Sequence, residues 1–178
     1  MKSVVKIIKL TPESKGLDRL YEIMIHAYST TEEEIWGKNY TRMPRIEFNE
    51  MIALGKIFGL YVDTIPVGSI QVSQLRPDTY VFGLLSVDFG YKGMNLGRKL
   101  IEAAEKEAKD SGAKFMELEI LRLKEGRIKA KQILHDWYVR QGYRLMETID
   151  FVDRKPTKAE KAELFVNPSV FDCYRKEL

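Results

Sequence analysis

Hydrophobic and polar positions along the chain alternate between the two-residue period of strands and the 3.6-residue period of helices. Strand patterns are predicted over residues 3–10, 58–62, 67–75, 80–87, 114–122, 143–152 and 171–176. Helical stripes are predicted over residues 17–28, 46–56, 96–110 and 126–141. The charged stretch at residues 153–163 is interpreted as an exposed connection or a short helix. No repeat, low-complexity tract or linker divides these elements, so residues 1–178 are predicted to form a single domain of mixed α/β class.

The most informative change of pattern lies between Leu85 and Leu100, where an apolar strand leads through a glycine-spaced turn into an amphipathic helix. The first N–H groups of a helix lack intrahelical partners and lie at the positive end of its dipole, so they suit a phosphate. Gly93 and Gly97 have no Cβ, which allows a sharp turn and the close approach of a ligand. The segment predicts an anion-binding turn, while a plain strand-to-helix turn remains the alternative.

Two nucleotide-binding motifs are excluded at this turn. A Walker loop ends in Gly-Lys-Ser or Gly-Lys-Thr, whereas Gly97 is followed by Arg98 and Lys99. The dinucleotide fingerprint Gly-x-Gly-x-x-Gly does not occur here.

The residues from Lys92 to Gly97 instead resemble the acetyl-CoA-binding motif of the GCN5-related N-acetyltransferase (GNAT) superfamily. That motif is Gln or Arg, two residues, Gly, one residue, and Gly or Ala, after a strand that ends in an apolar residue such as Val87. Lys92 replaces Gln or Arg and keeps a positive charge. Asn95 replaces the middle glycine. Asparagine tolerates a left-handed φ and is also a good helix cap, so either role preserves the turn.

A second segment, from His135 to Tyr143, resembles the later motif of the same family. In that motif a helix carries a tyrosine, continues for three residues, and ends at Gly followed by an aromatic residue. Tyr138, Gly142 and Tyr143 fit this pattern, and the tail at residues 171–176 resembles the closing strand of such enzymes. The two motifs occur in the expected order, which makes the resemblance more specific than either motif alone.

The resemblance implies a mostly antiparallel central sheet of six to seven strands, flanked by about four helices. It also implies a splay between the two central strands, where main-chain groups are free to contact the pantetheine arm of CoA. The turn would hold the pyrophosphate through main-chain N–H groups. The implied donor-binding residues are Leu85, Val87, Lys92, Gly93, Met94, Asn95, Leu96, Gly97 and Arg98.

Tyr138 matches the position of the family's general acid, whose phenol protonates the departing CoA thiolate. A thiol has a reference pKa of ~8.5, so this proton helps the reaction rather than deciding it. The alternative role for Tyr138 is aromatic packing against Trp137 and Tyr143.

The general base is less clearly marked in the sequence. An amine with a lysine-like pKa of ~10.4 must lose a proton before it attacks the thioester. Many family members carry a glutamate on the strand before the turn, but residues 80–85 contain none. Glu119 on the next strand is the predicted base, with Glu117 on the same face as its comparison. A solvated strand-face carboxylate is the alternative.

Other polar and aromatic residues receive simpler interpretations. His26 is assigned to packing or the surface, and His135 is a candidate to approach the cofactor sulfur or the acceptor. The run from Glu32 to Glu34 is interpreted as a solvated face that would also attract a cationic amine. Trp36 and Tyr40 belong either to the core or to a pocket wall.

Composition narrows the functional classes. The chain has 29 basic and 26 acidic residues, and a net charge of +3 is too small to indicate a nucleic-acid partner. Cys173 is the single cysteine, which excludes an internal disulfide, and no Cys–His spacing suggests a metal site. No apolar stretch approaches the roughly 20 residues that span a bilayer, so no membrane partner and a cytoplasmic location are expected.

The predicted function is therefore transfer of an acetyl group from the cosubstrate acetyl-CoA to a primary amine on a small molecule or a protein. The alternative is a catalytically weak acyl-CoA-binding or sensing module. The last strand would allow pairing with a second copy of the chain, so a homodimer is a further expectation.

Overall fold

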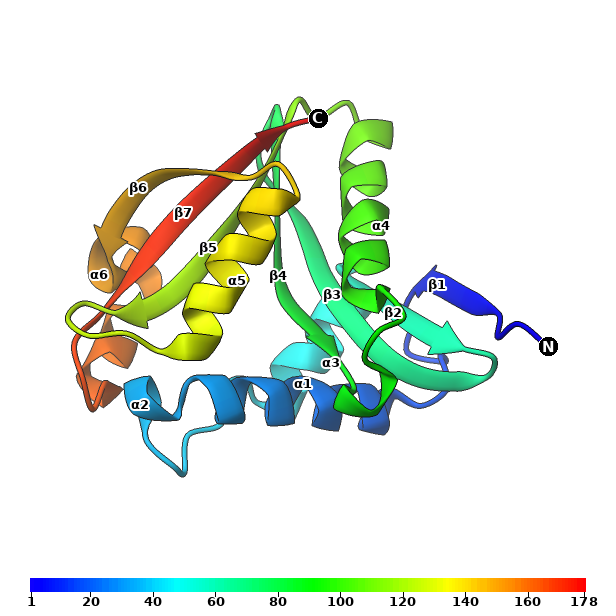
Figure 1. Ribbon diagram of the computed structural model, residues 1–178, viewed down its shortest axis with the longest axis horizontal. Helices are drawn as coiled ribbons and strands as arrows, with labels where there is room; N and C mark the ends of the chain where they lie inside the picture. Colours follow the sequence, from blue (N-terminus) through cyan, green and yellow to red (C-terminus); the bar gives the residue numbers. More distant parts are fainter. The chain divides into compact units, whose positions relative to one another are not determined.

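The computed structural model describes residues 1–178, in which seven strands are interleaved with helices (Figure 1). The strands are β1 (Val5–Lys9), β2 (Ile57–Val62), β3 (Ile65–Arg76), β4 (Thr79–Val87), β5 (Phe115–Leu123), β6 (Arg144–Asp150) and β7 (Ser169–Glu177). The α-helices are α1 (Leu17–Thr31), α2 (Glu33–Trp36), α3 (Arg45–Ala53), α4 (Leu96–Asp110), α5 (Lys129–Arg140) and α6 (Phe151–Arg154). Two 3₁₀ helices are η1 (Phe89–Tyr91) and η2 (Pro156–Leu164).

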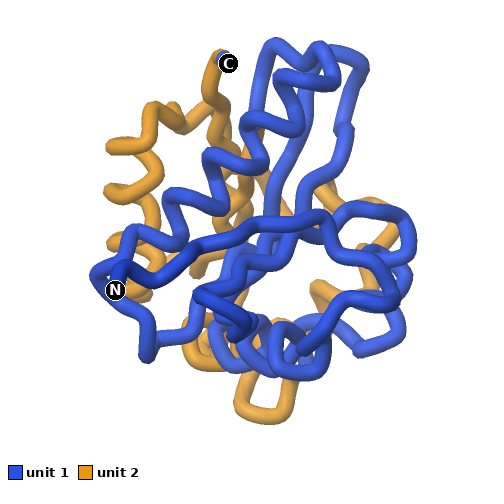
Figure 2. The backbone as a smooth tube through the Cα atoms, turned by 90° about the vertical axis from the view of Figure 1, so that its right-hand side faces the viewer, with its two compact units in different colours: residues 1–27, 41–116, 178 blue, residues 28–40, 117–177 orange.

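The chain divides into two compact units (Figure 2). Unit 1 consists of residues 1–27, 41–116 and 178, and unit 2 of residues 28–40 and 117–177. Helix α1 therefore begins in unit 1 and ends in unit 2.

Unit 1 is built on four strands that are neighbours in chain order, β1-β2-β3-β4, with every pair antiparallel. Helix α4 packs on β2, β3 and β4 of this sheet. It folds as a helix because its apolar residues recur every three or four positions and form one stripe. The buried stripe is Leu96, Leu100, Ile101, Ala104 and Ala108. The strand–turn–helix order predicted at residues 85–100 is confirmed.

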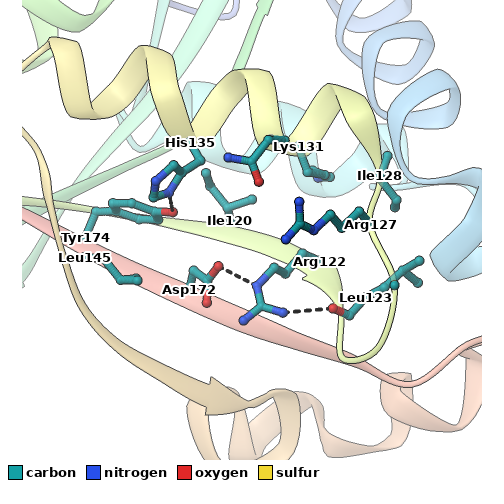
Figure 3. Close-up of a pocket in the computed structure, with 12 residues that line it drawn as sticks. Ile120, Arg122, Leu123, Arg127, Ile128, Lys131, His135, Leu145, Asp172 and Tyr174 are labelled. Atoms are coloured by element: carbon teal, nitrogen blue, oxygen red, sulfur yellow. Dashed lines mark hydrogen bonds and ion pairs between the residues drawn. The ribbon is translucent and has the colours of Figure 1, made fainter.

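In unit 2, strand β7 lies between β5 and β6 and runs antiparallel to β6. Helix α5 lies over one face of β5 and β7 (Figures 1 and 3). On the opposite face, Trp36 of α2 packs with Phe151 of α6 and Phe171 of β7. This apolar cluster is completed by Ile35, Leu121, Leu123 and Cys173. Trp36 and Tyr40 stack at 4.2 Å, which places Trp36 in the core of this unit and Tyr40 against the edge of that core.

Several predicted boundaries were wrong for identifiable reasons. The strand predicted over residues 143–152 ends at Asp150, because Phe151 turns into the core and begins α6. The helix predicted from residue 126 begins at Lys129, since Gly126 has a φ of +90° and Ile128 is extended. The region between the predicted helices 17–28 and 46–56, to which no element was assigned, holds the end of α1 and the short α2.

The predicted fold class is confirmed as mixed α/β with mostly antiparallel strands. The predicted splay lies between central strands that belong largely to different units, and it stays a prediction. The single-domain assignment also stays a prediction.

Candidate active site

Strand β4 carries a bulge immediately before the predicted donor-binding residues. Ser69 pairs with Ser86 and Gln71 with Gly83, so Ile70 faces both Leu84 and Leu85. Leu84 has a φ of +51°, a left-handed conformation that leucine rarely adopts. A bulge leaves one residue outside the ladder, so main-chain groups beside Leu85 are not used by β3. Leu84 was missed in the sequence, because leucine carries no turn signal.

The turn after β4 contains the 3₁₀ helix η1 and two left-handed residues, Gly93 and Asn95. Asp88 caps η1 by accepting a hydrogen bond from the Gly90 N–H at 2.8 Å. Gly93 then has a φ of +83°, and Asn95 has φ +55° and ψ +30°. A Cβ on Gly93 would meet nothing within 4 Å, so backbone conformation rather than crowding favours glycine there.

Asn95 resolves one alternative left open by the sequence. It adopts the left-handed conformation, and its side chain makes no capping hydrogen bond to α4. Asn95 therefore substitutes for glycine through its tolerance of positive φ and not as a helix cap.

The N-terminus of α4 lies uncapped and exposed at the end of this turn. The Lys99 N–H bonds to the Asn95 carbonyl at 3.1 Å, so the N–H groups from Leu96 to Arg98 precede the first intrahelical bond. The first turn contains no acidic residue. Lys92 lies with its Nζ 5.4 Å from the centre of the Phe89 ring, and Arg98 pairs with Glu102 at 3.0 Å. The arrangement provides main-chain donors with nearby positive charge, as a pyrophosphate requires.

A cavity of about 310 Å³ lies beside the C-terminal end of β4 in unit 1. Val87 and Phe89 line it together with the α1 residues Arg19, Glu22 and His26. Arg19 bonds to the Pro66 carbonyl at 2.8 Å and pairs with Asp88, which ties α1 to the start of the turn. His26 meets the edge of Phe89 at 5.7 Å, in agreement with its predicted packing role. Arg19 and Asp88 were missed in the sequence, because their partnership joins residues far apart in the chain.

Tyr138 is buried in unit 2, on α5. Its ring packs against Trp137 at 5.2 Å and edge-on to Tyr143 at 6.2 Å. Burial raises the pKa of Tyr138 well above its ordinary value, with Tyr28 adding to the shift. The phenol therefore stays protonated, which is the state a general acid needs. Tyr138 also packs against Trp137 and Tyr143, which was the alternative role considered from the sequence. The packing and the protonated phenol are compatible.

Glu119 and Glu117 share one face of β5, as the alternation predicted. Glu119 Oε1 accepts from Arg154 and Lys155, both at 3.2 Å, and Glu117 Oε2 accepts from Arg175 at 2.8 Å. Neither is solvated, since their side chains are 11% and 9% exposed. The neighbouring Ile120 and Arg122 face α5 (Figure 3), so alternation directs Glu119 to the other face of β5.

Glu32 contradicts the interpretation of residues 32–34 as a solvated face. Its side chain is 3% exposed and pairs at 2.7 Å with Lys131, itself 7% exposed. Trp36 Nε1 also donates to Glu32 Oε1 at 3.3 Å. Glu33 and Glu34 are exposed, as predicted. The sequence could not reveal a partner 99 residues away, and a buried charge is stable only when such a partner exists.

The donor-binding residues lie together in unit 1, and the two predicted catalytic residues lie in unit 2. The acetyltransferase (GNAT) family model matches residues 17–130, which include the bulged strand, the turn and α4. The chain belongs to the GNAT family. The match ends before Tyr138, so the role of that residue in this GNAT chain stays a prediction.

Solved structures of similar fold come from several organisms. N-acetylglutamate synthase from Neisseria gonorrhoeae, complexed with coenzyme A and N-acetyl-glutamate, has a TM-score of 0.69 at 13% identity. All of the GNAT chain is covered in that comparison, but it spans only 36% of the synthase chain. PaiA N-acetyltransferase from Thermoplasma acidophilum, in complex with coenzyme A, has a TM-score of 0.68 at 15% identity, covering 98% of this chain and 99% of that one. Ard1 from Thermoplasma volcanium has a TM-score of 0.66 at 16% identity, with 98% and 97% covered.

At these identities the similarity establishes the fold. A search of curated proteins found no match. No group of three or more His, Cys, Asp or Glu side chains is placed to hold a metal ion. None of the helices has the length and apolar character needed to cross a membrane.

Proposed function

We propose that this GNAT chain is an N-acetyltransferase that moves the acetyl group of acetyl-CoA to a primary amine on a small molecule or a protein. The observation that carries the proposal is the β4–α4 turn, whose left-handed Gly93 and Asn95 lead into an uncapped helix N-terminus inside the family match. Two solved structures of this fold hold coenzyme A, and their names specify N-acetylation.

In this proposal the main chain at Leu85, where the bulge leaves β4 groups unused by β3, and at Val87 holds the pantetheine arm. The N–H groups from Leu96 to Arg98 hold the pyrophosphate. Fixing the thioester in this way supplies the orientation on which acyl transfer depends. The nine predicted donor-binding residues thus lie along one strand–turn–helix segment, and these assignments give roles to five of them.

The chemical step forms an amide bond between the acceptor nitrogen and the acetyl carbon and breaks the bond from that carbon to sulfur. Tyr138 gives its proton to the departing thiolate. Glu119 is the proposed acceptor of the amine proton. Because its Oε1 already accepts from Arg154 and Lys155, Oε2 is the oxygen that would take the proton.

The proposal is tested by measuring thiol release from acetyl-CoA with a panel of amines that includes a polyamine, a free amino acid and a lysine peptide. Mass spectrometry of the acceptor identifies the acetylated nitrogen. We expect release that depends on an amine. Tight binding of CoA without turnover on any amine would instead support the alternative of an acyl-CoA-binding module.

A matched pair of variants tests the turn itself. Arg98→Gln removes a positive charge at the first turn of α4, and Lys106→Gln removes one from the middle of the same helix. Both side chains are exposed and each pairs with a carboxylate four residues on. We expect Arg98→Gln to weaken acetyl-CoA binding several-fold and Lys106→Gln to leave it unchanged. If the two substitutions weakened acetyl-CoA binding equally, this turn would not be the pyrophosphate-binding site.

A further inference from the structure

A second cavity, of about 300 Å³, lies in unit 2 between α5 and the face of β5 and β7 (Figure 3). Its lining is neither an apolar core nor part of the predicted donor turn. Arg122 of β5, Lys131 and His135 of α5, and Asp172 and Tyr174 of β7 contribute polar groups. Arg127 enters from the connection between β5 and α5.

Cations outnumber carboxylates among the polar side chains around this cavity. Arg122, Arg127 and Lys131 contribute three cations, whereas Asp172 is the only carboxylate in the lining. Asp172 is already engaged, since it accepts from Arg122 Nε at 2.5 Å and from Thr148 Oγ1 at 2.6 Å. Lys131 is engaged by Glu32. Arg127 makes no ion pair, so the cavity has an uncompensated positive charge.

His135 adds a donor of its own. Its Nδ1 lies 2.6 Å from the Tyr174 hydroxyl. Burial raises the pKa of Tyr174 to about 12, so its hydroxyl keeps its proton. We assign the tautomer in which this hydroxyl donates to Nδ1 of His135, which places the ring proton on Nε2 as a donor for an anion.

The rest of the lining is apolar and comes from Ile120, Leu123, Ile128 and Leu145. A ligand that complements this lining has an acidic head and a short hydrocarbon body. Arginine guanidinium groups pair best with planar or tetrahedral oxyanions, through two parallel hydrogen bonds. The volume of the cavity lies at the small end of ligand pockets, which suits a metabolite and not a polymer segment.

We propose that this cavity binds a small amphipathic anion, with a carboxylate or phosphate group held by Arg127, Arg122 and His135 and an apolar body against Ile120 and Leu145. The cavity shares no residue with the acyl-donor turn, because every residue that lines it belongs to unit 2 and the turn belongs to unit 1. Helix α5 carries both His135 and Tyr138, so an occupied cavity would contact the helix that holds the predicted general acid.

The test uses the full chain saturated with CoA, so that the donor site is already filled. Hexanoate and phenyl phosphate are titrated by calorimetry and by NMR, with hexanamide as the uncharged analogue. We expect saturable one-to-one binding of hexanoate or phenyl phosphate, with shifts concentrated at backbone amides 127–135, and weaker binding of hexanamide. A preference between the two anions identifies the head group as carboxylate or phosphate.

Two exposed cations on either side of Ile128 provide a matched comparison. Arg127 lines the cavity and Lys129 does not. Arg127→Gln is expected to weaken anion binding about tenfold, whereas Lys129→Gln leaves it within about twofold. The proposal is overturned if no anion saturates up to about 10 mM, if hexanamide binds as well as hexanoate, or if Lys129→Gln is as damaging as Arg127→Gln.

Discussion

Asn95 shows how much a single residue contributes to the donor turn. Its φ of +55° places it in the left-handed region, where most residues with a Cβ lose stability. Asparagine is better tolerated there than other residues with a side chain, and glycine is better still. Asn95 thus departs from the family motif in residue type but keeps the left-handed backbone conformation that glycine adopts easily.

This geometry predicts a difference between two substitutions at Asn95. Asn95→Gly should leave CoA affinity within about twofold, because glycine adopts the same φ freely. Asn95→Ala should cost about 1 kcal/mol of the free energy of unfolding, since alanine has no compensating local contact. Urea denaturation and CoA titration measure both quantities. Met94→Ala is the control for the free energy of unfolding alone, because Met94 has no positive φ. A loss of stability in Asn95→Gly equal to that in Asn95→Ala would contradict the interpretation.

Tyr138 carries the clearest kinetic prediction at the same scale. Tyr138→Phe removes the phenol and keeps the packed ring, so the protein should fold. We expect kcat to fall on the order of 10²-fold, with little change in the KM for acetyl-CoA, because the proton is transferred only as the thiolate leaves. Tyr143→Phe removes the neighbouring phenol as a control. An unchanged kcat in Tyr138→Phe would exclude Tyr138 as the general acid.

At the scale of elements, α5 is held in unit 2 by an unusual contact. Its only buried residues are Lys131 and Tyr138, which lie two turns apart. Lys131 pairs with Glu32 at the junction of α1 and α2, and this ion pair anchors the helix that carries Tyr138. Removing one partner of a buried pair leaves an uncompensated charge, whereas replacing both with apolar residues is often nearly neutral.

A double-mutant cycle on Lys131 and Glu32 tests whether losing one partner costs more than replacing both. Lys131→Met should destabilise the protein by about 3–5 kcal/mol, and the double variant Lys131→Met with Glu32→Leu should recover most of the loss. Urea unfolding gives the four free energies. The exposed pair of Lys106 and Asp110 provides the comparison, and Lys106→Met should change stability little, because solvent screens an exposed ion pair. Additive effects at Lys131 and Glu32 would show that the pair does not act as a unit.

The elements that the sequence predicted well are those whose signals are local. The stripe of α4, the turn at Gly93 and the alternation of Glu117 with Glu119 each depend on residues within a few positions of one another. The bulge at Leu84 and the partners of Glu32 depend instead on strand register and tertiary packing. Long-range pairs of this kind leave no periodic trace, so the buried state of Glu32 and the ion pairs of Glu119 could not be predicted.

At the scale of the whole molecule, acidic groups with raised pKa values occur in both units. Burial raises the pKa of Tyr61 in unit 1 and, in unit 2, raises that of Cys173 to about 11 and that of Tyr174 to about 12. Burial also raises the pKa of Tyr138. Each of these groups is neutral when protonated, so the folded state retains protons that the unfolded chain releases at lower pH.

The sign of this linkage predicts alkaline destabilisation. Unfolded cysteine and tyrosine lose protons near pH ~8.5 and ~10, and above those values the unfolded state binds fewer protons than the folded state. The free energy of unfolding should therefore be fully present below about pH 8.5 and fall progressively as pH rises toward the folded pKa values. Thermal unfolding from pH 7 to 11 measures the trend.

The variant Cys173→Ala removes the group that titrates first in the unfolded chain. Its Tm should therefore decline less between about pH 8.5 and 10 than the Tm of the parent protein, even if it begins lower. Parallel curves for the two proteins would show that Cys173 does not contribute, and a Tm that rises with pH would contradict the linkage as a whole.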